Sequence, residues 1–565
     1  MERRVLLAIS LSFLVLFLYQ SFLPPPPEPG ASPAAPTAAA PGGGSGAAVP
    51  APAPVRPSPS AAPVAPVAAV RGADSEQEFT VTTADVEAVF TNRGGRLRHW
   101  RLRHYRDASG APVDLVPTTD GAALPFSLVA PDAAVTARLN DALYAVDLNA
   151  PPRIDASTTP AVLVFVYEAA DGLRVRKQFA FEPTGYGVTF TPQVAQGGAA
   201  MNAGVLWGPG LGDEIARSAG SGGMFSGTYV YPAEGFVHRD GEVTRYAGAA
   251  AATAGPQQGA FRFFGVDDHY FVAAVIDAPG NQRIDFAHVP LPDVVNPAAV
   301  RQLVSFSAAF DQPPGALRFF VGPKQFEALR AVDPEFTKVI NFGMFAILAV
   351  PLLGALQWVN GFVGNYGWAI VILTILINVV MWPLRHKSVV SMRRMQELQP
   401  QLKAIQGRYA HLKMTDPARQ KMNEEVMALY KAKGVNPASG CVPMLLTLPV
   451  LFAFYSLLSQ AIEIRGAHFA GWITDLSQHD PWYITPLLMG VSMLWQQRLQ
   501  PGTGDPVQQK VLMFMPVMFT VMFLWAPSGL VIYWFVSNLW AIGQQYFTNW
   551  LIGPPKVPAA AGGKR

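Results

Sequence analysis

Six runs of apolar residues mark this chain, and they fall into two groups. The first run, Val5–Leu23, contains no charge or proline and at about 19 residues is long enough to cross a bilayer as a helix. The other five lie in the C-terminal third and are interrupted by polar residues or prolines: Trp368–Leu384, Cys441–Gln460, Trp482–Trp495, Val511–Ala526 and Gly529–Ile542. This pattern predicts a polytopic α-helical membrane protein.

Most of the later runs are short as well as polar. A helix of about 14–17 residues covers roughly 21–26 Å, whereas the hydrocarbon core is about 30 Å thick. Either flanking residues lengthen these helices or the bilayer thins around them. Because unpaired polar groups are costly in hydrocarbon, we predict that those within the runs face one another or line a wet cavity open to the cytoplasm. These are Thr374, Asn378, Thr447, Ser456, Ser459, Thr520, Tyr533, Ser537 and Asn538.

A β-structure pattern fills the region between the two hydrophobic groups. Apolar and polar residues alternate in Phe79–Phe90, and Asn92–Gly95 provides a turn. Ala161–Tyr167 and Leu173–Phe181 flank a short Gly-containing segment, which predicts a hairpin. With no sustained helical period before about Phe320, one large β-sandwich is expected, followed by a short helix at Lys324–Val332.

The N-terminal run predicts which side of the membrane this β-domain occupies. Its length favours a retained anchor over a cleaved signal peptide, whose apolar region is usually about 7–15 residues long. Arg3 and Arg4 would keep the N-terminus in the cytoplasm. The following Pro- and Ala-rich residues 24–75 form an extended linker, so the β-domain is expected on the outer side.

The apolar segment Asn341–Val359 allows two interpretations, a further span or an amphipathic helix at the membrane interface. It contains Pro351, Gly354 and Gln357. A span here would place the next basic segment outside, so we predict an interfacial helix.

That basic segment, residues 385–434, has eleven Lys or Arg and four Asp or Glu. The positive-inside rule places it in the cytoplasm. Apolar residues recur every three or four positions on both sides of Met414, which predicts two antiparallel helices; Pro400 kinks the first, and Asp416 with Pro417 begins the second. Its cations are candidates for binding lipid headgroups or ribosomal RNA: Arg393, Arg394, Lys403 and Arg408 among them.

Several classes of function lack their motifs. Hydrophobic residues make up 50% of the chain and charged residues 14%, and the single Cys441 excludes intrachain disulfides. No phosphate-binding Gly-Lys-Ser/Thr loop occurs, and the predicted spans hold no His, Asp, Glu or Lys. We therefore expect no enzyme activity, no metal, no cofactor, no small-molecule substrate and no ion-coupled transport.

Specific motifs carry a family resemblance that is strongest after residue 366. Gly434–Pro437, Gly440–Pro443 and Leu448-Pro449 resemble the third-span signature of the YidC membrane-protein insertases. Ala467–Leu476, Asp505-Pro506, Phe523–Leu530 and Tyr533–Asn538 resemble later parts of that family. Phe319–Pro323 resembles the end of its outer domain. The large outer domain is similar to the Gram-negative form, and to mutarotase-like β-sandwiches.

The resemblance implies an N-terminal anchor plus a five-span core with a cytoplasmic helical hairpin, and a large periplasmic β-sandwich. The expected domains are residues 1–23 (anchor), 24–75 (linker), 76–333 (β-sandwich), 334–364 (interfacial helix), 365–550 (core, with hairpin 385–434) and 551–565 (cytoplasmic tail). Such proteins act in the bacterial inner membrane with both termini cytoplasmic.

It also implies a function. New membrane proteins would be inserted, alone or with the Sec translocon and its accessory subunits, through a groove open to the cytoplasm and lipid. The ribosome would be at most a weak partner, because the tail is short, and membrane lipids a further one. Thr374, Thr447, Tyr533 and Trp534 would line the groove, with Leu451, Met489 and Met522 along an apolar slide.

One position departs from the family pattern. The family usually has a groove Arg three residues before its Met-aromatic-Pro motif, here Met381–Pro383, and this chain has Asn378 instead. Arg385 lies seven residues further along and shares the helical face of Asn378 about 10 Å away. We hypothesise that Arg385 supplies the missing charge.

Two other classes of function compete with insertion. A channel or transporter would need a pathway open to both sides of the membrane. An enzyme anchored in the membrane would need an acid/base pair in a cleft, and no residue spacing singles one out.

Overall fold

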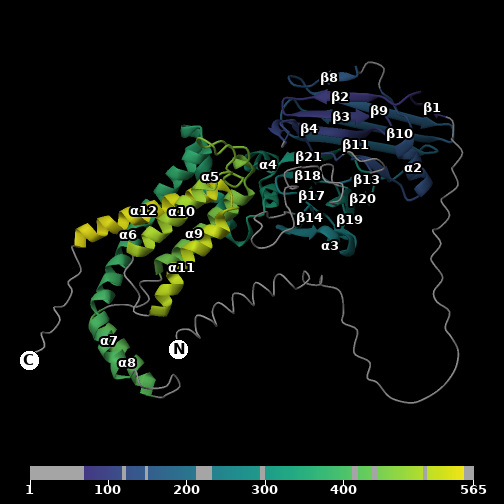
Figure 1. The fold of residues 1–565 in the computed structure, drawn as a ribbon. Coiled ribbons are helices and arrows are strands. Elements are labelled where there is room, and N and C mark those ends of the chain that lie inside the picture. Colours follow the sequence, from purple (N-terminus) through teal and green to yellow (C-terminus); the bar gives the residue numbers. More distant parts are fainter. Residues whose placement is uncertain are drawn as a thin grey trace, which may run out of the picture. The chain divides into compact units, whose positions relative to one another are not determined.

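A computed structural model of the chain describes residues 69–107, 109–117, 123–146, 151–211, 232–292, 300–409, 418–434, 442–499 and 506–552. These residues divide between Pro323 and Lys324 into two compact units, one rich in β-strands and one helical (Figure 1). Three predicted features lie outside the described residues: the anchor, the linker as far as residue 68, and the tail beyond Ile552. Cys441 also lies outside them.

Among the described residues, three sheets build the β-rich unit. The largest has the order β1 (Ala69–Arg71), β9 (Ala161–Ala169), β10 (Leu173–Phe181), β11 (Gly187–Gln196), β21 (Leu317–Pro323), β18 (Phe271–Ile276), β17 (Phe263–Asp267), β14 (Glu234–Arg239) and β15 (Glu242–Ala247), with β7 (Ala145–Val146) beside β9 and β12 (Ala199–Ala200) beside β11. The second has the order β16 (Gln257–Gly259), β19 (Gln282–Pro292), β20 (Val300–Phe310), β13 (Gly204–Trp207) and β6 (Ser127–Val129). The third has the order β5 (Pro112–Asp114), β4 (Arg96–Arg106), β3 (Val86–Thr91), β2 (Glu78–Thr82) and β8 (Arg153–Asp155).

The hairpin predicted near residue 170 is confirmed as β9 and β10. The two strands pair antiparallel, with Phe179 opposite Leu163. Alternate residues of β10 face the core, because neighbouring side chains on a strand point to opposite faces. The buried aromatic rings of this core include Phe90 and Phe179, whose centroids lie 4.6 Å apart.

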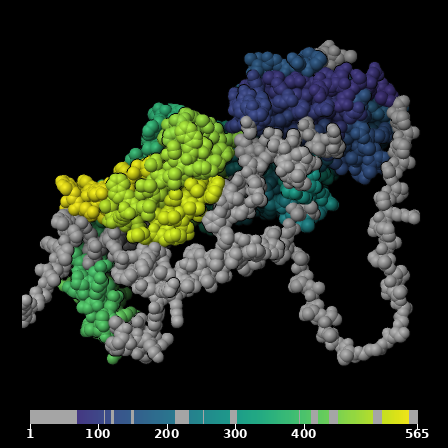
Figure 2. Space-filling model, in the orientation of Figure 1, coloured from purple at the N-terminus to yellow at the C-terminus, as the bar shows by residue number. Residues whose placement is uncertain are grey.

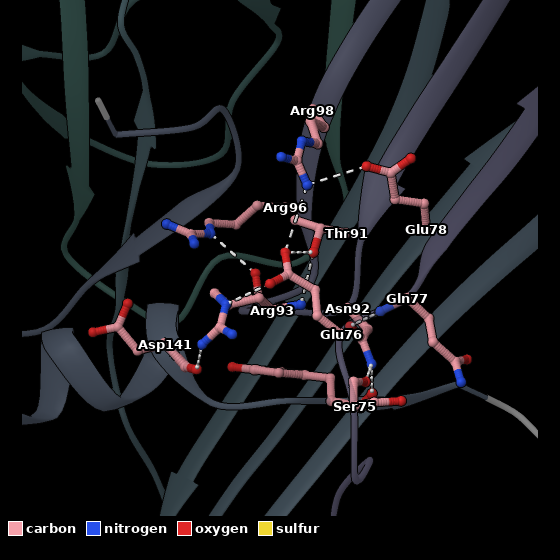
Figure 3. A network of polar contacts seen from close by, with 11 residues as sticks. Ser75, Glu76, Gln77, Glu78, Thr91, Asn92, Arg93, Arg96, Arg98 and Asp141 are labelled. Carbon is pink, nitrogen blue, oxygen red and sulfur yellow. Dashed lines mark hydrogen bonds and ion pairs between the residues drawn. The ribbon is translucent and has the colours of Figure 1, made fainter. Parts of the chain in front are cut away.

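The turn predicted at Asn92–Gly95 joins β3 to β4, and Gly94 and Gly95 there have φ of 70° and 55°. Figure 3 shows the polar network around this turn. The side chain of Asn92 accepts from the Gln77 amide at 2.8 Å and donates to Ser75 O at 3.0 Å. The turn thereby holds the chain segment that leads into β2.

Two short helices in this unit were not predicted, α2 (Ala133–Asp141) and α3 (Gly248–Thr253). Asp132 caps α2 by accepting from the amides of Ala134 and Val135. Each helix is too short to show a sustained apolar period in the sequence.

The helical unit begins after β21. It contains α4 (Phe326–Val332), η2 (Pro334–Val339), η3 (Gly343–Phe345), α5 (Ala346–Val363), α6 (Tyr366–Glu397), α7 (Gln399–Arg408), α8 (Ala418–Ala432), α9 (Val442–Gln460), η5 (Ile462–Ile464), α10 (Ile484–Leu499), α11 (Pro506–Phe523) and α12 (Ser528–Ile552). α4 agrees with the helix predicted at Lys324–Val332.

Flanking residues lengthen two of the short apolar runs considerably. α6 has 32 residues and α12 has 25, so α12 alone extends about 37 Å. Among the described residues, Gly343–Val363 and Tyr366–Ser391 are long and apolar enough to cross a membrane, and Pro449–Gln460 and Met513–Phe523 are shorter apolar helices. By length and composition, α5 can therefore be either a membrane span or a helix at the membrane interface.

The basic segment is helical. α6 ends at Glu397 and α7 begins at Gln399, with Pro400 in its first turn, and Gly434 after α8 has φ of 63°. α7 and α8 lie against each other where Glu425 accepts from Arg408 at 2.7 Å and from the Tyr409 hydroxyl at 2.8 Å. In the space-filling view they form a narrow green arm beside the bundle (Figure 2). The proposed cap residues Asp416 and Pro417 lie outside the described residues.

Candidate functional site

A ladder of polar side chains runs along one face of α6. Thr374 is completely buried and donates to Ile370 O at 2.6 Å. One turn later, Asn378 is 2% exposed and its amide nitrogen donates to Thr374 O at 2.7 Å. The carbonyl oxygen of Asn378 accepts from Arg385 Nη1 at 2.6 Å. The amide therefore uses both of its ends within α6: its nitrogen bonds the turn before it, and its oxygen bonds Arg385, two turns after it.

Tyr533 of α12 completes this polar cluster. Its buried side chain is close enough to Arg385 for the two groups to interact electrostatically. Its ring stacks on Phe454 of α9, with centroids 4.3 Å apart and an interplanar angle of 12°. Three helices that are distant in sequence, α6, α9 and α12, thus meet around the Tyr533 side chain. We call Thr374, Asn378, Arg385 and Tyr533 the polar cluster.

Further polar contacts between α6 and α12 lie beyond the polar cluster. Gln544 donates to Trp382 O at 3.4 Å, and His386 Nδ1 lies 3.3 Å from the Thr548 hydroxyl. Sequence reasoning missed Gln544 and Thr548. Their spacing from Tyr533, at 11 and 15 residues, places all three on one face of a helix, and that spacing could have revealed them.

A second polar contact joins α12 to α10. Asn538 donates to Ser492 Oγ at 3.0 Å, and Ser492 donates to Met489 O at 2.6 Å. This is the interhelical hydrogen bonding expected of polar residues within apolar helices. Ser492 was not among the predicted site residues.

Trp534 was predicted to line the groove, and it packs on α11. Its ring lies 5.5 Å from Phe519 and 4.8 Å from Phe523. Thr447 belongs to α9, but its side chain lies outside the described residues. The polar cluster thus unites four of the six predicted groove residues.

The three predicted slide residues lie on three different helices. Leu451 of α9 is half-buried, Met489 of α10 is fully buried, and Met522 of α11 is 40% exposed. Met522 belongs to an apolar surface of α11 with Phe514, Val517, Met518 and Val521. On the basic helices, Arg394, Lys403 and Arg408 are exposed, and the side chain of Arg393 lies outside the described residues.

The N-terminal ends of α6 and α12 are joined by hydrogen bonds to the α9–α10 loop. Gln478 O accepts from both the amide and the hydroxyl of Ser528, each at 2.7 Å, at the start of α12. Asn365, just before α6, donates to His468 O at 3.1 Å and to Phe469 O at 3.0 Å. The loop therefore ties α6 to α12 at this end.

Asp480 orders the same loop where α10 begins. Its carboxylate accepts from the Trp472 indole at 2.9 Å, the Trp482 amide at 2.9 Å, and the amide and hydroxyl of Thr485 at 2.7 and 2.8 Å. Burial acts to raise the pKa of Asp480, but these hydrogen bonds outweigh it and lower the pKa.

The described residues contain no group of three or more His, Cys, Asp or Glu side chains arranged to hold a metal ion. What they offer at the polar cluster is one guanidinium, an amide and hydroxyls, surrounded by apolar helices. Such a set can bind polar or anionic groups by hydrogen bonding and charge.

Comparison with known proteins covers nearly the whole chain. The family described as YidC periplasmic domain matches residues 78–355, and the family described as 60Kd inner membrane protein matches residues 358–553. The membrane protein insertase YidC of Syntrophus aciditrophicus is 35% identical over 97% of this chain and 99% of its own length. That of Geobacter metallireducens is 33% identical over 97% and 98%.

Solved structures resemble the chain more distantly. An active YidC insertase crystal structure has 18% identity and a TM-score of 0.34, covering 85% of this chain and 94% of its own. A galactose mutarotase related enzyme from Lactobacillus acidophilus has 8% identity and a TM-score of 0.27, covering 43% of this chain and 97% of its own.

Proposed function

Because the chain belongs to the YidC family of membrane protein insertases, which are inner-membrane proteins with a periplasmic domain and not enzymes, we propose that it inserts new membrane proteins through the polar cluster. The hydrogen bond between Arg385 and Asn378 is the observation that carries this proposal. It places a cation and its polar support among apolar helices, where such groups are costly unless they have a task.

The polar cluster would receive the polar tail that a client must move across the membrane. A guanidinium attracts acidic groups, and the attraction is stronger where apolar helices exclude bulk water. Thr374, Asn378 and Tyr533 would offer hydrogen bonds to the tail in place of water. No nucleotide is needed in this scheme, because the apolar part of the client gains free energy on entering lipid.

The apolar surface of α11 would guide the client helix into the bilayer. Met518 and Met522 are exposed there, and flexible thioethers adapt to client helices of different shape. Leu451 of α9 would form the facing side. Met489 of α10 is fully buried. It would therefore support this path by packing and would not contact the client.

The proposed topology has the N-terminal anchor and five core spans, with both termini and the basic helices in the cytoplasm. Arg385 lies at the end of the predicted span next to that basic segment, so the groove would open toward the cytoplasm. The hydrogen bonds of Ser528 and Asn365 with the α9–α10 loop support an outer end that is closed. A closed outer end disfavours the alternative function, a channel or transporter. A channel would conduct ions when the purified protein is placed in liposomes.

α5 would lie at the outer interface. Its exposed side chains are large and apolar, including Ile347, Trp358 and Phe362, and α5 packs on both α6 and α9. Exposed Arg394, Lys403 and Arg408 would meet anionic lipid headgroups on the other side. The Sec translocon, its accessory subunits and, weakly, the ribosome are further proposed partners.

The spacing of tryptophans supports a thin bilayer around the core. Tryptophan favours the two membrane interfaces. Trp482 is 63% exposed near the start of α10 and Trp495 is 49% exposed near its end, 13 residues later. The helical part, from Ile484 to Trp495, covers about 17 Å at 1.5 Å per residue, and the two non-helical residues before it add at most about 7 Å, so the two tryptophans are closer than the ~30 Å of ordinary hydrocarbon. Thinning would lower the barrier for the polar tail.

Site-specific photo-crosslinking to a stalled nascent membrane protein tests the proposal. A crosslinker at Met522 or Leu451 should capture the client's apolar helix. Val491 is the matched control, because it is an exposed apolar residue on α10 that does not belong to the proposed slide. Equal crosslinking from all three positions, or none from Met522 and Leu451, would contradict the proposed path.

A further inference from the structure

Three segments of the helical unit meet at the side chain of Glu463, in η5. One carboxylate oxygen, Oε1, accepts from the Phe326 amide at 3.2 Å and from Gln357 Nε2 at 3.0 Å. Phe326 begins α4, and Gln357 lies in the second half of α5. The partners are 137 and 106 residues away in sequence, so these bonds fix tertiary structure and not a local turn.

Glu463 is partly exposed as a residue, but its carboxylate lies beside apolar residues. Its neighbours Ile462 and Ile464 are buried, and the second carboxylate oxygen, Oε2, is buried with no hydrogen-bond partner among the described residues. Burial raises the pKa of Glu463, and the nearby Glu327 adds to this effect. A carboxylate that loses contact with water is costly. The presence of Glu463 at this position therefore indicates a structural role for its side chain.

The contact with Gln357 determines which face of α5 is turned outward. Trp358 and Phe362 lie one and five residues further along α5, and both are exposed. If Gln357 is held toward the bundle, Trp358 and Phe362 lie about 100° and 140° from it around the helix, which turns both side chains to the outside. The start of the segment is fixed independently, since Ser456 of α9 donates to Phe342 O at 2.8 Å and Phe345 stacks on Phe452.

We propose that Glu463 is a positioning residue that fixes the rotation of α5 on the core and joins it to α4, the segment that follows the β-rich unit. The proposal rests on the insertase function, because α5 packs against α6 and α9, two of the three helices that meet at the polar cluster. A correctly rotated α5 holds these two helices at the spacing that the polar cluster requires.

The test uses full-length protein in proteoliposomes, with Cys441→Ser and Phe362→Cys carrying a spin label whose mobility and lipid accessibility report the rotation of α5. We expect Glu463→Ala to change both signals and to lower client insertion about five- to tenfold, the effect of about one hydrogen bond. Glu463→Gln should restore both, because its amide oxygen can accept the same two bonds. Gln357→Ala should shift the label in the same direction as Glu463→Ala and keeps the proposal testable if that variant does not fold.

Two controls separate this proposal from others. Glu327→Ala removes an exposed acidic side chain of α4 and should change neither the label nor insertion. Arg385→Ala should lower insertion and leave the label at position 362 unchanged, so a failure of the proposed function is distinguishable. An unchanged label in both Glu463→Ala and Gln357→Ala, or an altered label with full insertion, would overturn the proposal.

Discussion

Arg385 donates a hydrogen bond of 2.6 Å to the side-chain oxygen of Asn378, two turns earlier in α6. Because the asparagine amide carries no charge, it orients the guanidinium without neutralising it. The same amide is itself held by Thr374 O. The hydrogen bond therefore directs the cation along α6 into the polar cluster.

Arg385→Ala should reduce insertion of clients with acidic translocated tails by about tenfold or more, since one lost ion pair of about 1.4 kcal/mol has that effect. Arg385→Lys should retain part of the activity, because lysine keeps the charge and loses the planar geometry. Asn378→Ala should have a smaller effect, because the charge remains. Protease protection of the translocated tail measures all three. Full activity of Arg385→Ala would contradict the role of the charge.

Moving the charge along α6 gives a stricter test. In the double variant Asn378→Arg with Arg385→Asn, the cation and its amide partner exchange places on the same helical face. We expect insertion to recover substantially relative to Arg385→Asn alone, measured with the same acidic-tail client. A client with a neutral tail is the control and should respond little to either variant. Absence of recovery would mean that position 385 matters for a reason other than its charge.

The sequence pattern was sufficient wherever local periodicity decides the structure. The hairpin of β9 and β10 and the turn at Asn92–Gly95 follow from alternation and turn residues, and both were predicted. Lys177 shows the limit of this approach. Alternation places it in the core, where its side chain is held by carbonyls of Gly94 and Phe126, 83 and 51 residues away. No local rule predicts such partners.

The candidate site was predictable in part for a similar reason. Arg385 and Asn378 lie on one helix, so helical geometry alone placed them on the same face, but the hydrogen bond that joins their side chains was not predicted. Tyr533 and Trp534 were both expected in the groove, but adjacent residues on a helix point about 100° apart. Tyr533 faces α6 and α9, and Trp534 faces α11. Which of the two points inward depends on how α12 packs, and that depends on contacts between distant segments.

Asp480→Asn should destabilise the helical unit by about 3 kcal/mol, roughly the value of one or two hydrogen bonds to a charged group. The new amide nitrogen cannot accept from Thr485. Because the folded pKa of Asp480 is lowered, its contribution is present above the unfolded pKa of about 3.9 and is lost as the pH falls through the folded pKa. Thermal unfolding of the full-length protein in detergent at pH 7 and below pH 4 should show the two proteins converging in acid; an equal difference at both pH values would contradict this role.

Lys177 predicts that the stability of the β-rich unit also rises with pH, but in a higher pH range. Burial lowers the pKa of Lys177 well below its ordinary value, and nearby Arg96 lowers it further. Between the folded pKa and the unfolded pKa of about 10.4, only the unfolded chain binds this proton, so stability should rise with pH. Hydrogen exchange of β10 amides in the full-length protein measures it. Lys177→Met should remove this rise, and parallel pH profiles for the two proteins would contradict the prediction.

Gly490 tests how closely α10 must approach α11. A Cβ atom at Gly490 would lie 2.1 Å from Thr520 Oγ1 and 3.0 Å from its methyl carbon. Thr520 cannot rotate freely, because it is β-branched and its hydroxyl donates to Pro516 O at 2.7 Å. Gly490→Ala should therefore separate the helices and cost about 1–3 kcal/mol of stability, the usual range for overpacking.

The second substitution Thr520→Ala should recover most of that loss, because it removes the atoms with which the new methyl group collides. Thr520→Ala alone is the control and should cost less than Gly490→Ala, since it removes one local hydrogen bond and little apolar contact. Reversible unfolding of the four proteins in mixed micelles gives the coupling free energy directly. Additive losses in the double variant would show that Gly490 is required for its backbone and not for the space it leaves to Thr520.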